Sequence, residues 1–264
     1  MAAITLDKWV DNQQSRGRYT FLRTEAVRGS GLSPEAAKKA LQRLVRRRRV
    51  AKAKDFFYVI IPLEYVSAGG PPASWFVHDL MTAMGLPYYA GLLTAAGLQG
   101  ASHQQPQEFQ VVTDRSVRAI TVGRVRLRFF ASKYIQQACT TNIKTPTGSM
   151  RLSTPETTVV DLVRFAKAAG RLDYVAAVIA ELAPSLNPKK LLAALRLVGD
   201  VPNTQRTGYI LDLIRARRLS DPIHAWVERQ KFRPVPLRTG RPVAGAREDR
   251  RWHVLVNGPL EVER

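Results

Sequence analysis

One short stretch of the sequence, residues 33–49, constrains the fold more than any other. Ser33 can accept hydrogen bonds from free helical N–H groups, and Pro34 suits the first helical position. Glu35 favours the positive end of the helix dipole. Apolar residues then recur at helical spacing, which predicts one buried face. The expected members of this face are Ala37, Ala40, Leu41, Leu44 and Val45.

The opposite face of this expected helix, residues 33–46, is basic and leads into four consecutive arginines at 46–49. It carries Lys38, Lys39, Gln42, Arg43 and Arg46. Cations and an amide on an exposed helix face are groups that read base edges in the major groove of DNA. The alternative is that the arginines form only a solvated helix end, where cations are stabilising in any case. We favour DNA binding because the cap, the apolar stripe and the basic face agree.

The neighbouring segments complete a small domain over residues 1–66. Two shorter helices are expected upstream, at 4–13 and 22–28, with glycines at 29 and 31 allowing a tight turn. Two strands are expected downstream, at 50–54 and 56–61, around a turn at Lys54-Asp55. Three helices and a basic hairpin predict a winged helix-turn-helix with the hairpin as wing.

The candidate DNA-binding residues follow from this arrangement. We expect Lys38, Lys39, Gln42 and Arg43 to meet base edges, and the cations that follow to meet phosphates. With the helix cap, the full set is Ser33, Lys38, Lys39, Gln42, Arg43, Arg46, Arg47, Arg48, Arg49, Lys52 and Lys54. Because operator symmetry mirrors protein symmetry, the expected partner is double-stranded DNA with an inverted repeat.

The charge balance agrees with a polyanionic partner. The chain has 41 Lys+Arg against 21 Asp+Glu, a net charge of +20, and residues 1–66 hold 14 of the basic and six of the acidic side chains. No apolar run reaches 18 residues and no signal peptide is recognisable, so no membrane partner is expected. The single cysteine, Cys139, excludes an internal disulfide and suits a reducing, cytoplasmic location.

A small and proline-rich stretch, residues 67–72, is expected to link the first domain to a second over residues 73–264. Helices are expected at 75–84 and 92–97, followed by strands at 108–113, 119–122 and 124–130. Five helices are then expected at 158–169, 173–182, 188–198, 207–218 and 222–230, with a late strand at 253–256. The predicted fold class is α+β: a winged helix-turn-helix, then a mixed domain with a small sheet and a helical bundle.

Catalytic chemistry is hard to find in the sequence. There is no aspartate pair with D-x-D spacing, no phosphate-binding glycine loop and no histidine–cysteine cluster. Glu156 and Asp161 fall near the same face of one expected helix, but a helix cap and a buried acceptor explain them equally well. We therefore expect no enzyme activity, no catalytic residue, no metal site and no cofactor.

Several short motifs, in order along the chain, resemble the AbiEi antitoxin family of AbiE-type (type IV) toxin–antitoxin systems. They follow the basic N-terminal domain and are Pro87–Gly97, Phe109–Thr113, the S-x-x-E-x-T-x-x-D pattern at 153–161 and the R-x-G-Y-x-L pattern at 206–211. The family often has an Arg-Gly turn before the wing, where this chain has Arg47-Arg48, and a glycine at the wing tip, where it has Lys54-Asp55. The arginine common in the family's E-R-T helix start is Thr157 here.

The resemblance implies a DNA-binding autorepressor whose C-terminal domain antagonises a cognate nucleotidyltransferase toxin. A stand-alone transcription factor with a ligand- or partner-sensing second domain remains an alternative. A metal-dependent DNA-processing enzyme and a general nucleic-acid coating protein are further alternatives.

Overall fold

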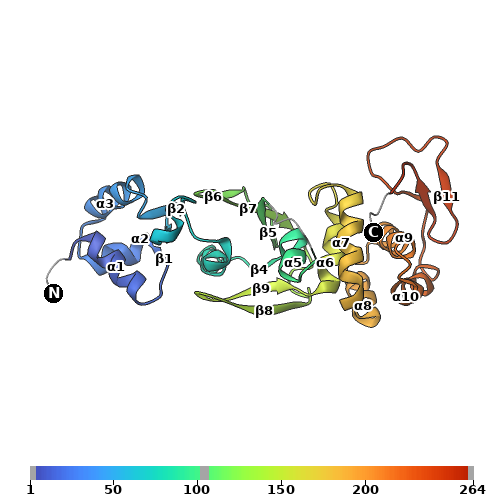
Figure 1. Cartoon of the computed structure of the whole chain (residues 1–264), viewed down its shortest axis with the longest axis horizontal. Helices are drawn as coiled ribbons and strands as arrows, with labels where there is room; N and C mark the ends of the chain where they lie inside the picture. The colour runs from blue at the N-terminus through green and yellow to red at the C-terminus, as the bar shows by residue number, and fades with distance from the viewer. Residues whose placement is uncertain (1–3, 102–106, 261–264) are drawn as a thin grey trace. The chain divides into compact units, whose positions relative to one another are not determined.

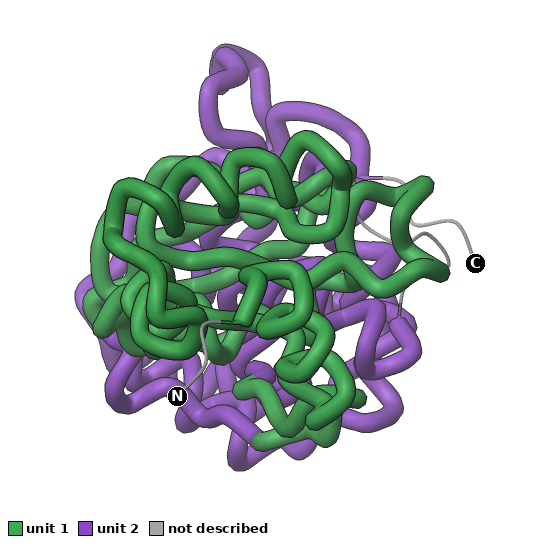
Figure 2. The backbone as a smooth tube through the Cα atoms, turned by 90° about the vertical axis from the view of Figure 1, so that its left-hand side faces the viewer, with its two compact units in different colours: residues 1–89, 107–133, 142–151 green, residues 90–106, 134–141, 152–264 purple. Residues whose placement is uncertain are grey.

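The computed structural model describes residues 4–101 and 107–260. Residues 1–3, 102–106 and 261–264 fall within the two expected domains but lie outside this described part. The chain forms two compact units (Figure 2). The first comprises residues 1–89, 107–133 and 142–151, and the second comprises residues 90–106, 134–141 and 152–264. Both helices and sheets are present, so the fold is mixed α+β.

The N-terminal part of the first unit combines three helices with a three-stranded antiparallel sheet (Figure 1). Its elements are α1 (Leu6–Ser15), β1 (Thr20–Leu22), α2 (Arg23–Ser30), α3 (Pro34–Arg46), β2 (Val50–Lys54) and β3 (Phe57–Ile60). The strand order is β1-β3-β2, with Phe21 opposite Tyr58 and Ala51 opposite Val59. The three helices and the two later strands were predicted, whereas β1 was not.

Aromatic side chains hold this part together. Trp9 meets Phe21 edge to face at a centroid distance of 5.1 Å, and Phe21 stacks on Tyr58 at 5.5 Å. Leu41 and Leu44 of α3 belong to the same buried cluster, whose buried members all lie between residues 6 and 60. Residues 6–60 therefore have a hydrophobic core of their own.

A six-stranded sheet has the strand order β6-β7-β5-β4-β9-β8. Most of it belongs to the first unit, and only the ends of β4, β8 and β9 are assigned to the second unit. Its strands are β4 (Tyr88–Ala90), β5 (Glu108–Thr113), β6 (Ile120–Val122), β7 (Val125–Ala131), β8 (Thr140–Thr145) and β9 (Gly148–Ser153). Strands β5 and β7 pair in parallel, and β6 and β7 pair antiparallel. The sequence analysis did not predict β4, β8 or β9.

The expected linker at 67–72 makes defined contacts with this sheet. The Arg124 N–H donates to the Ala68 carbonyl at 2.9 Å, and Gly69 lies against Gly123, the turn before β7. The short helical turns η1 (Leu63–Tyr65) and η2 (Ala73–Trp75) flank this segment, and α4 (Val77–Ala83) follows. On β7, Arg126 and Arg128 both pair with Glu108 of β5, at 3.1 and 3.3 Å. The arginine row of this strand is therefore partly compensated within the sheet.

The second unit is mostly helical. Its helices are α5 (Leu92–Leu98), α6 (Pro155–Arg164), α7 (Leu172–Leu182), α8 (Pro188–Val198), α9 (Val201–Leu213) and α10 (Arg217–Val227), with the short turn η3 (Ala183–Ser185) after α7. A small sheet follows, made of β10 (Val235–Pro236), β11 (Arg247–Asp249) and β12 (Val254–Val256). No helix within the described residues has both the length and the apolar content to cross a membrane.

Three helix predictions in this unit were displaced. Helix α6 was expected at 158–169 but spans Pro155–Arg164. Helix α9 was expected at 207–218 but begins at Val201, because Asp200 caps it by accepting the Asn203 N–H at 3.1 Å and Pro202 fits its first turn. Helix α10 was expected to start at Pro222, which instead lies inside it. By contrast, α8 has the predicted bounds, with Asn187 as its cap and Gly199 at its end.

Candidate functional site

Helix α3 is anchored by one side and capped as its sequence predicts. The Ser33 hydroxyl oxygen accepts the Ala36 N–H at 3.3 Å, and Pro34 occupies the first turn. The buried residues of α3 are Ala37, Ala40, Leu41 and Leu44. Val45 was expected among them but is 36% exposed, because it lies at the edge of the apolar stripe.

The other side of α3 is polar and faces solvent. All five residues predicted for it are exposed: Lys38, Lys39, Gln42, Arg43 and Arg46. Within residues 4–101 and 107–260, no carboxylate lies within ion-pair distance of these four cations. The helix therefore presents an uncompensated positive face with one amide near its middle, which is a surface that suits a polyanion.

The end of α3 is a Schellman motif with an arginine where glycine is usual. The Arg48 N–H donates to the Val45 carbonyl and the Arg49 N–H donates to the Leu44 carbonyl, both at 3.0 Å. Arg48 adopts the left-handed conformation, with φ +55°. This conformation costs a non-glycine residue about 1–2 kcal/mol, so the backbone of Arg48 is strained at this position.

The remaining candidate cations differ in how they are engaged. Arg47 lies 3.9 Å from Asp7, Arg49 pairs with Asp11, and Lys52 pairs with Asp55 at 3.0 Å. The hydrogen bond and the charge of Lys52 hold the pKa of Asp55 below its usual value, and the same contact raises the pKa of Lys52. Exposed pairs of this kind contribute little to stability, so these cations can exchange a carboxylate for a phosphate.

The hairpin turn carries an aromatic residue that the sequence assigned to a strand. Phe56 was expected in the strand 56–61, but β3 begins at Phe57 and Phe56 is 39% exposed at the turn. The run Phe56-Phe57-Tyr58 signals a strand, but it does not indicate which aromatic side chain is exposed. Phe56 lies beside Asp55 and Lys54, at the tip of the basic hairpin.

The two acidic residues of helix α6 have structural contacts. The Glu156 carboxylate accepts the Asn187 N–H at 3.1 Å, ahead of α8, and Asp161 pairs with Arg164 at 3.6 Å. Both carboxylates are buried, at 5% and 2% exposed. The helix cap is Thr154, which accepts the Thr157 N–H at 3.4 Å. These contacts give Glu156, Asp161 and Thr154 structural roles that need no catalytic function.

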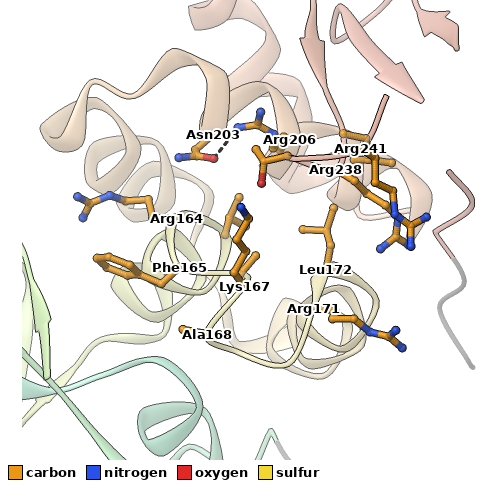
Figure 3. A pocket seen from close by; sticks show the side chains of 14 residues that line it. Arg164, Phe165, Lys167, Ala168, Arg171, Leu172, Asn203, Arg206, Arg238 and Arg241 are labelled. Carbon is orange, nitrogen blue, oxygen red and sulfur yellow. Dashed lines mark hydrogen bonds between the residues drawn. The ribbon is translucent and has the colours of Figure 1, made fainter. Parts of the chain in front are cut away.

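Helix α9 is tied to the C-terminal segment by buried polar groups. The Gln205 amide nitrogen donates to the backbone carbonyls of Trp252, Arg233 and His253, at 2.9, 3.1 and 3.3 Å. Its neighbour Arg206 donates from Nε to the Pro236 carbonyl at 2.9 Å and from Nη1 to the Asn203 amide oxygen at 2.8 Å (Figure 3). Burial lowers the pKa of Arg206, and the charge of Asp200 opposes this.

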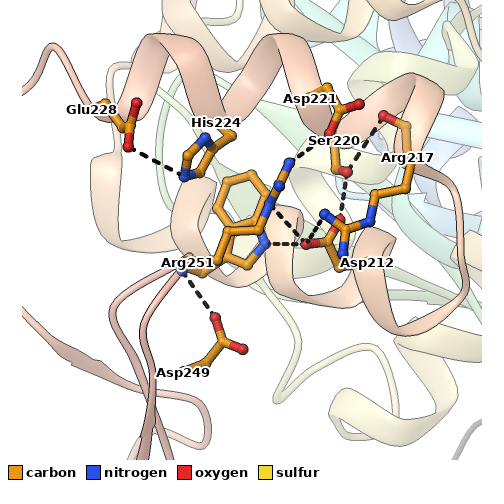
Figure 4. A network of polar contacts seen from close by, with 9 residues as sticks. Asp212, Arg217, Ser220, Asp221, His224, Glu228, Asp249 and Arg251 are labelled. Carbon is orange, nitrogen blue, oxygen red and sulfur yellow. Dashed lines mark hydrogen bonds and ion pairs between the residues drawn. The ribbon is translucent and has the colours of Figure 1, made fainter.

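A second network joins α9 to α10 and to the segment after β11 (Figure 4). Asp212 accepts the Trp252 indole N–H at 2.7 Å and the Ser220 hydroxyl at 2.5 Å. Arg251 lies 3.0 Å and Arg217 3.4 Å from the same carboxylate. One aspartate at the end of α9 thus holds three separate elements together.

The most informative comparison falls on this part of the chain. Residues 89–213 match a family model described as the AbiEi antitoxin C-terminal domain. This segment belongs to the AbiEi antitoxin family. The resemblance expected from the motifs is therefore confirmed, and the α6 and α9 motifs both lie inside the AbiEi domain.

A solved structure shows the same fold beyond the AbiEi domain. The crystal structure of the RV2827C protein from Mycobacterium tuberculosis is similar with a TM-score of 0.68 and 11% identity, covering 96% of this chain and 92% of that chain. At this identity the likeness concerns the fold alone. No curated protein matches the chain.

The AbiEi domain gives the chain an antitoxin role in general terms, and an antitoxin implies a toxin partner. The AbiEi family is one of antitoxins, not of enzymes. Among the described residues, no three side chains of the types His, Cys, Asp and Glu gather in a group that could hold a metal ion.

Proposed function

We propose that this protein is a DNA-binding antitoxin that represses its own operon and antagonises a nucleotidyltransferase toxin. Residues 1–66 would be the DNA-binding domain, 67–72 the linker and 73–264 the antitoxin-like domain. The observation that carries the DNA-binding part is α3, which packs by Ala37, Ala40, Leu41 and Leu44 and exposes a face of cations.

The topology around α3 supports a winged helix-turn-helix. The element order α1-β1-α2-α3-β2-β3 and the sheet order β1-β3-β2 provide a helix pair followed by a hairpin. Gly31, with φ +70°, ends α2 and lets the chain turn into α3. In such domains the second helix of the pair enters the major groove, which is wide enough for an α-helix.

Each polar residue of this surface then has a role. Arg43 and the two lysines, Lys38 and Lys39, suit guanine edges, whereas the Gln42 amide suits adenine. Phosphate contacts are assigned to Arg46, Arg47, Arg48, Arg49, Lys52 and Lys54, with Ser33 holding the N-terminal end of the helix in place. Base contacts would set specificity, and phosphate contacts would set affinity and its dependence on salt.

The AbiEi domain supports the second activity. An antitoxin needs a toxin, and the family resemblance points to a nucleotidyltransferase encoded beside it. Both partners, operator DNA and toxin, belong to the cell interior, so we place the protein in the cytoplasm.

The DNA-binding proposal is tested by a gel shift at several salt concentrations with DNA from upstream of the protein's own gene and with shuffled DNA. We expect a preference of about a thousandfold or more for the upstream DNA at physiological salt. Equal and steeply salt-dependent binding to both DNAs would contradict a sequence-specific repressor. The antitoxin proposal is tested separately, by growth rescue when the full chain is co-expressed with the neighbouring toxin, and failure of rescue would contradict it.

A further inference from the structure

The second unit contains a cavity of about 520 Å³ between the end of α6, the start of α7, α9 and residues 237–241 (Figure 3). This volume lies in the range of pockets that bind small molecules, about 300–1,000 Å³. Six cationic side chains line it, and no acidic side chain does: Arg164, Lys167, Arg171, Arg206, Arg238 and Arg241. The charge of its lining therefore favours anionic ligands over neutral or cationic ones.

Within the part of the chain that the structure describes, four of these cations have no counter-ion. Arg164 pairs with Asp161 at 3.6 Å, and Arg238 pairs with Asp173. Over the described residues, no carboxylate lies within 4.0 Å of Lys167, Arg171, Arg206 or Arg241. Several uncompensated charges around one cavity with partly apolar walls produce a strong local positive potential.

Arg206 is the best-fixed of these groups. It is 8% exposed and lines the cavity, and it donates to two neutral acceptors, the Pro236 carbonyl and the Asn203 amide oxygen. Asn203 in turn donates to Asp200 at 2.7 Å, so this carboxylate bonds to the amide and forms no ion pair with Arg206. Its second terminal nitrogen, Nη2, has no hydrogen-bond partner in the described part of the chain. A buried guanidinium with an unused donor favours an anionic acceptor from outside the protein.

The other end of the cavity holds two more arginines, Arg238, which pairs with Asp173, and Arg241. The buried Nε atom of Arg238 has no hydrogen-bond partner among the described residues. Figure 3 shows the guanidinium groups of Arg238 and Arg241 beside each other, whereas the Lys167 chain rises toward Asn203 and Arg206. Because two cationic groups lie at different positions along one cavity, a ligand with several linked anionic groups suits it better than a single small anion.

We propose that this cavity binds the polyphosphate group of a small molecule. Phosphate oxygens match the planar donors of arginine, and linked phosphate groups carry several negative charges close together. The cavity also has an apolar lining made of Val163, Phe165, Leu172 and Leu237, which can cover an organic group attached to the phosphates. This inference does not depend on DNA binding by α3.

The test is isothermal titration calorimetry of the full chain with inorganic tripolyphosphate at physiological ionic strength, repeated with sulfate. We expect one tripolyphosphate per chain and no comparable sulfate binding. The double variant Lys167→Ala/Arg241→Ala should bind at least tenfold more weakly. Both residues are exposed and neither side chain makes a hydrogen bond within the described fold, so the variant should fold, and Lys167→Gln alone provides a milder second variant.

A matched control separates the cavity from overall charge. Lys189→Ala/Arg196→Ala removes one lysine and one arginine from exposed positions of α8, outside the cavity lining. The proposal requires this control to bind like the unmodified chain. Equal weakening in both double variants, several sites per chain, or sulfate binding as tight as tripolyphosphate would overturn it.

A nucleoside triphosphate distinguishes the sources of the polyphosphate group. Equal affinity for the nucleotide and for tripolyphosphate would support a site that recognises phosphates alone. Tighter nucleotide binding, reduced by Leu172→Ala or Phe165→Ala, would support use of the apolar wall as well. A nucleotide that does not compete with tripolyphosphate would contradict a site open to organic phosphates.

Discussion

The indole ring of Trp252 lies directly against Gly208 of α9. A β-carbon added at Gly208 would come within 2.1 Å of Trp252 Cζ3, a distance that no real contact of this kind reaches. Trp252 is fully buried, and its N–H is held by Asp212 at 2.7 Å, so the ring has little freedom to move away. The glycine of the R-x-G-Y-x-L motif is thus required by packing against a residue outside the AbiEi domain.

Gly208→Ala is expected to destabilise the protein by about 1–3 kcal/mol or more, because the added methyl group overpacks the Trp252 site. The measurement is the free energy of unfolding from urea denaturation. Gly97→Ala is the matched control, since Gly97 is exposed on α5 with open space around its β-carbon position. That change should stabilise by about 0.5–1 kcal/mol, as alanine is the better helix former. Equal effects of the two substitutions would contradict the packing argument.

Arg48→Gly should stabilise the protein by about 1 kcal/mol, because glycine adopts the left-handed Schellman position without the cost that arginine bears. Thermal or urea unfolding of the variant measures this gain. Arg47→Gly is the control: Arg47 has an ordinary φ of −80°, so glycine there should not stabilise.

The same substitution separates stability from DNA binding. If Arg48 contacts a phosphate, Arg48→Gly should bind operator DNA more weakly while being more stable, and the salt slope of binding should fall by about one. Unchanged affinity and slope would remove Arg48 from the DNA-binding set without affecting the stability prediction.

Lys39→Ala and Arg43→Ala should each weaken operator binding by about 1–3 kcal/mol and relax sequence preference, because both residues are proposed to meet base edges. Gel shifts with operator and shuffled DNA provide the measurement. Lys8→Ala and Arg16→Ala remove the same charges from exposed positions on α1 and at its C-terminal cap, outside α3, and should change specificity little. Loss of specificity in both sets would place the reading surface elsewhere.

Stability should fall between pH 10 and 12 in part through Tyr88. Burial raises the pKa of Tyr88 from its ordinary value of 10.0 to about 12. The unfolded chain therefore ionises first as pH rises, so this contribution is intact below pH 10 and is lost toward pH 12, at about 3 kcal/mol for a shift of this size. Denaturant unfolding of the wild-type protein across this range gives the slope.

Tyr88→Phe isolates that contribution. The variant should be less stable at pH 8, because the hydroxyl group contacts His78 Nδ1 at 3.2 Å and the Arg151 N–H at 3.4 Å. It should nevertheless lose less stability between pH 10 and 12. Some slope should remain, since burial also raises the pKa of Tyr58 and Tyr209. A slope identical to that of the wild-type protein would show that Tyr88 ionises freely in the fold.

The elements that sequence predicted well are those whose signals are local. Helices α3 and α8 have a cap, a proline in the first turn and a defined end within a few residues, so their bounds were predicted correctly. Strands β1 and β4 are three residues long and depend on partners far along the chain, such as the pairing of Ala90 with Leu152. Such pairings leave no local periodicity to detect.

The candidate sites divide in the same way. The exposed face of α3 follows from helical spacing, whereas the cationic cavity gathers side chains from residue 164 to residue 241. Nothing near Lys167 in the sequence indicates that Arg206 or Arg241 lies close by. The role of Gly208 was equally hidden, because its neighbour Trp252 comes 44 positions later.

The ties of α9 to the C-terminal segment bear on how the antitoxin activity can be dissected. A fragment ending at Leu213, where the AbiEi match stops, would leave the Gln205 amide without its three carbonyl acceptors and Asp212 without the Trp252 indole. It would also open the apolar surface on which Trp252 packs. Inactivity of such a fragment would therefore report a damaged helix, not the absence of toxin-binding residues. The smallest informative fragment extends through Val256.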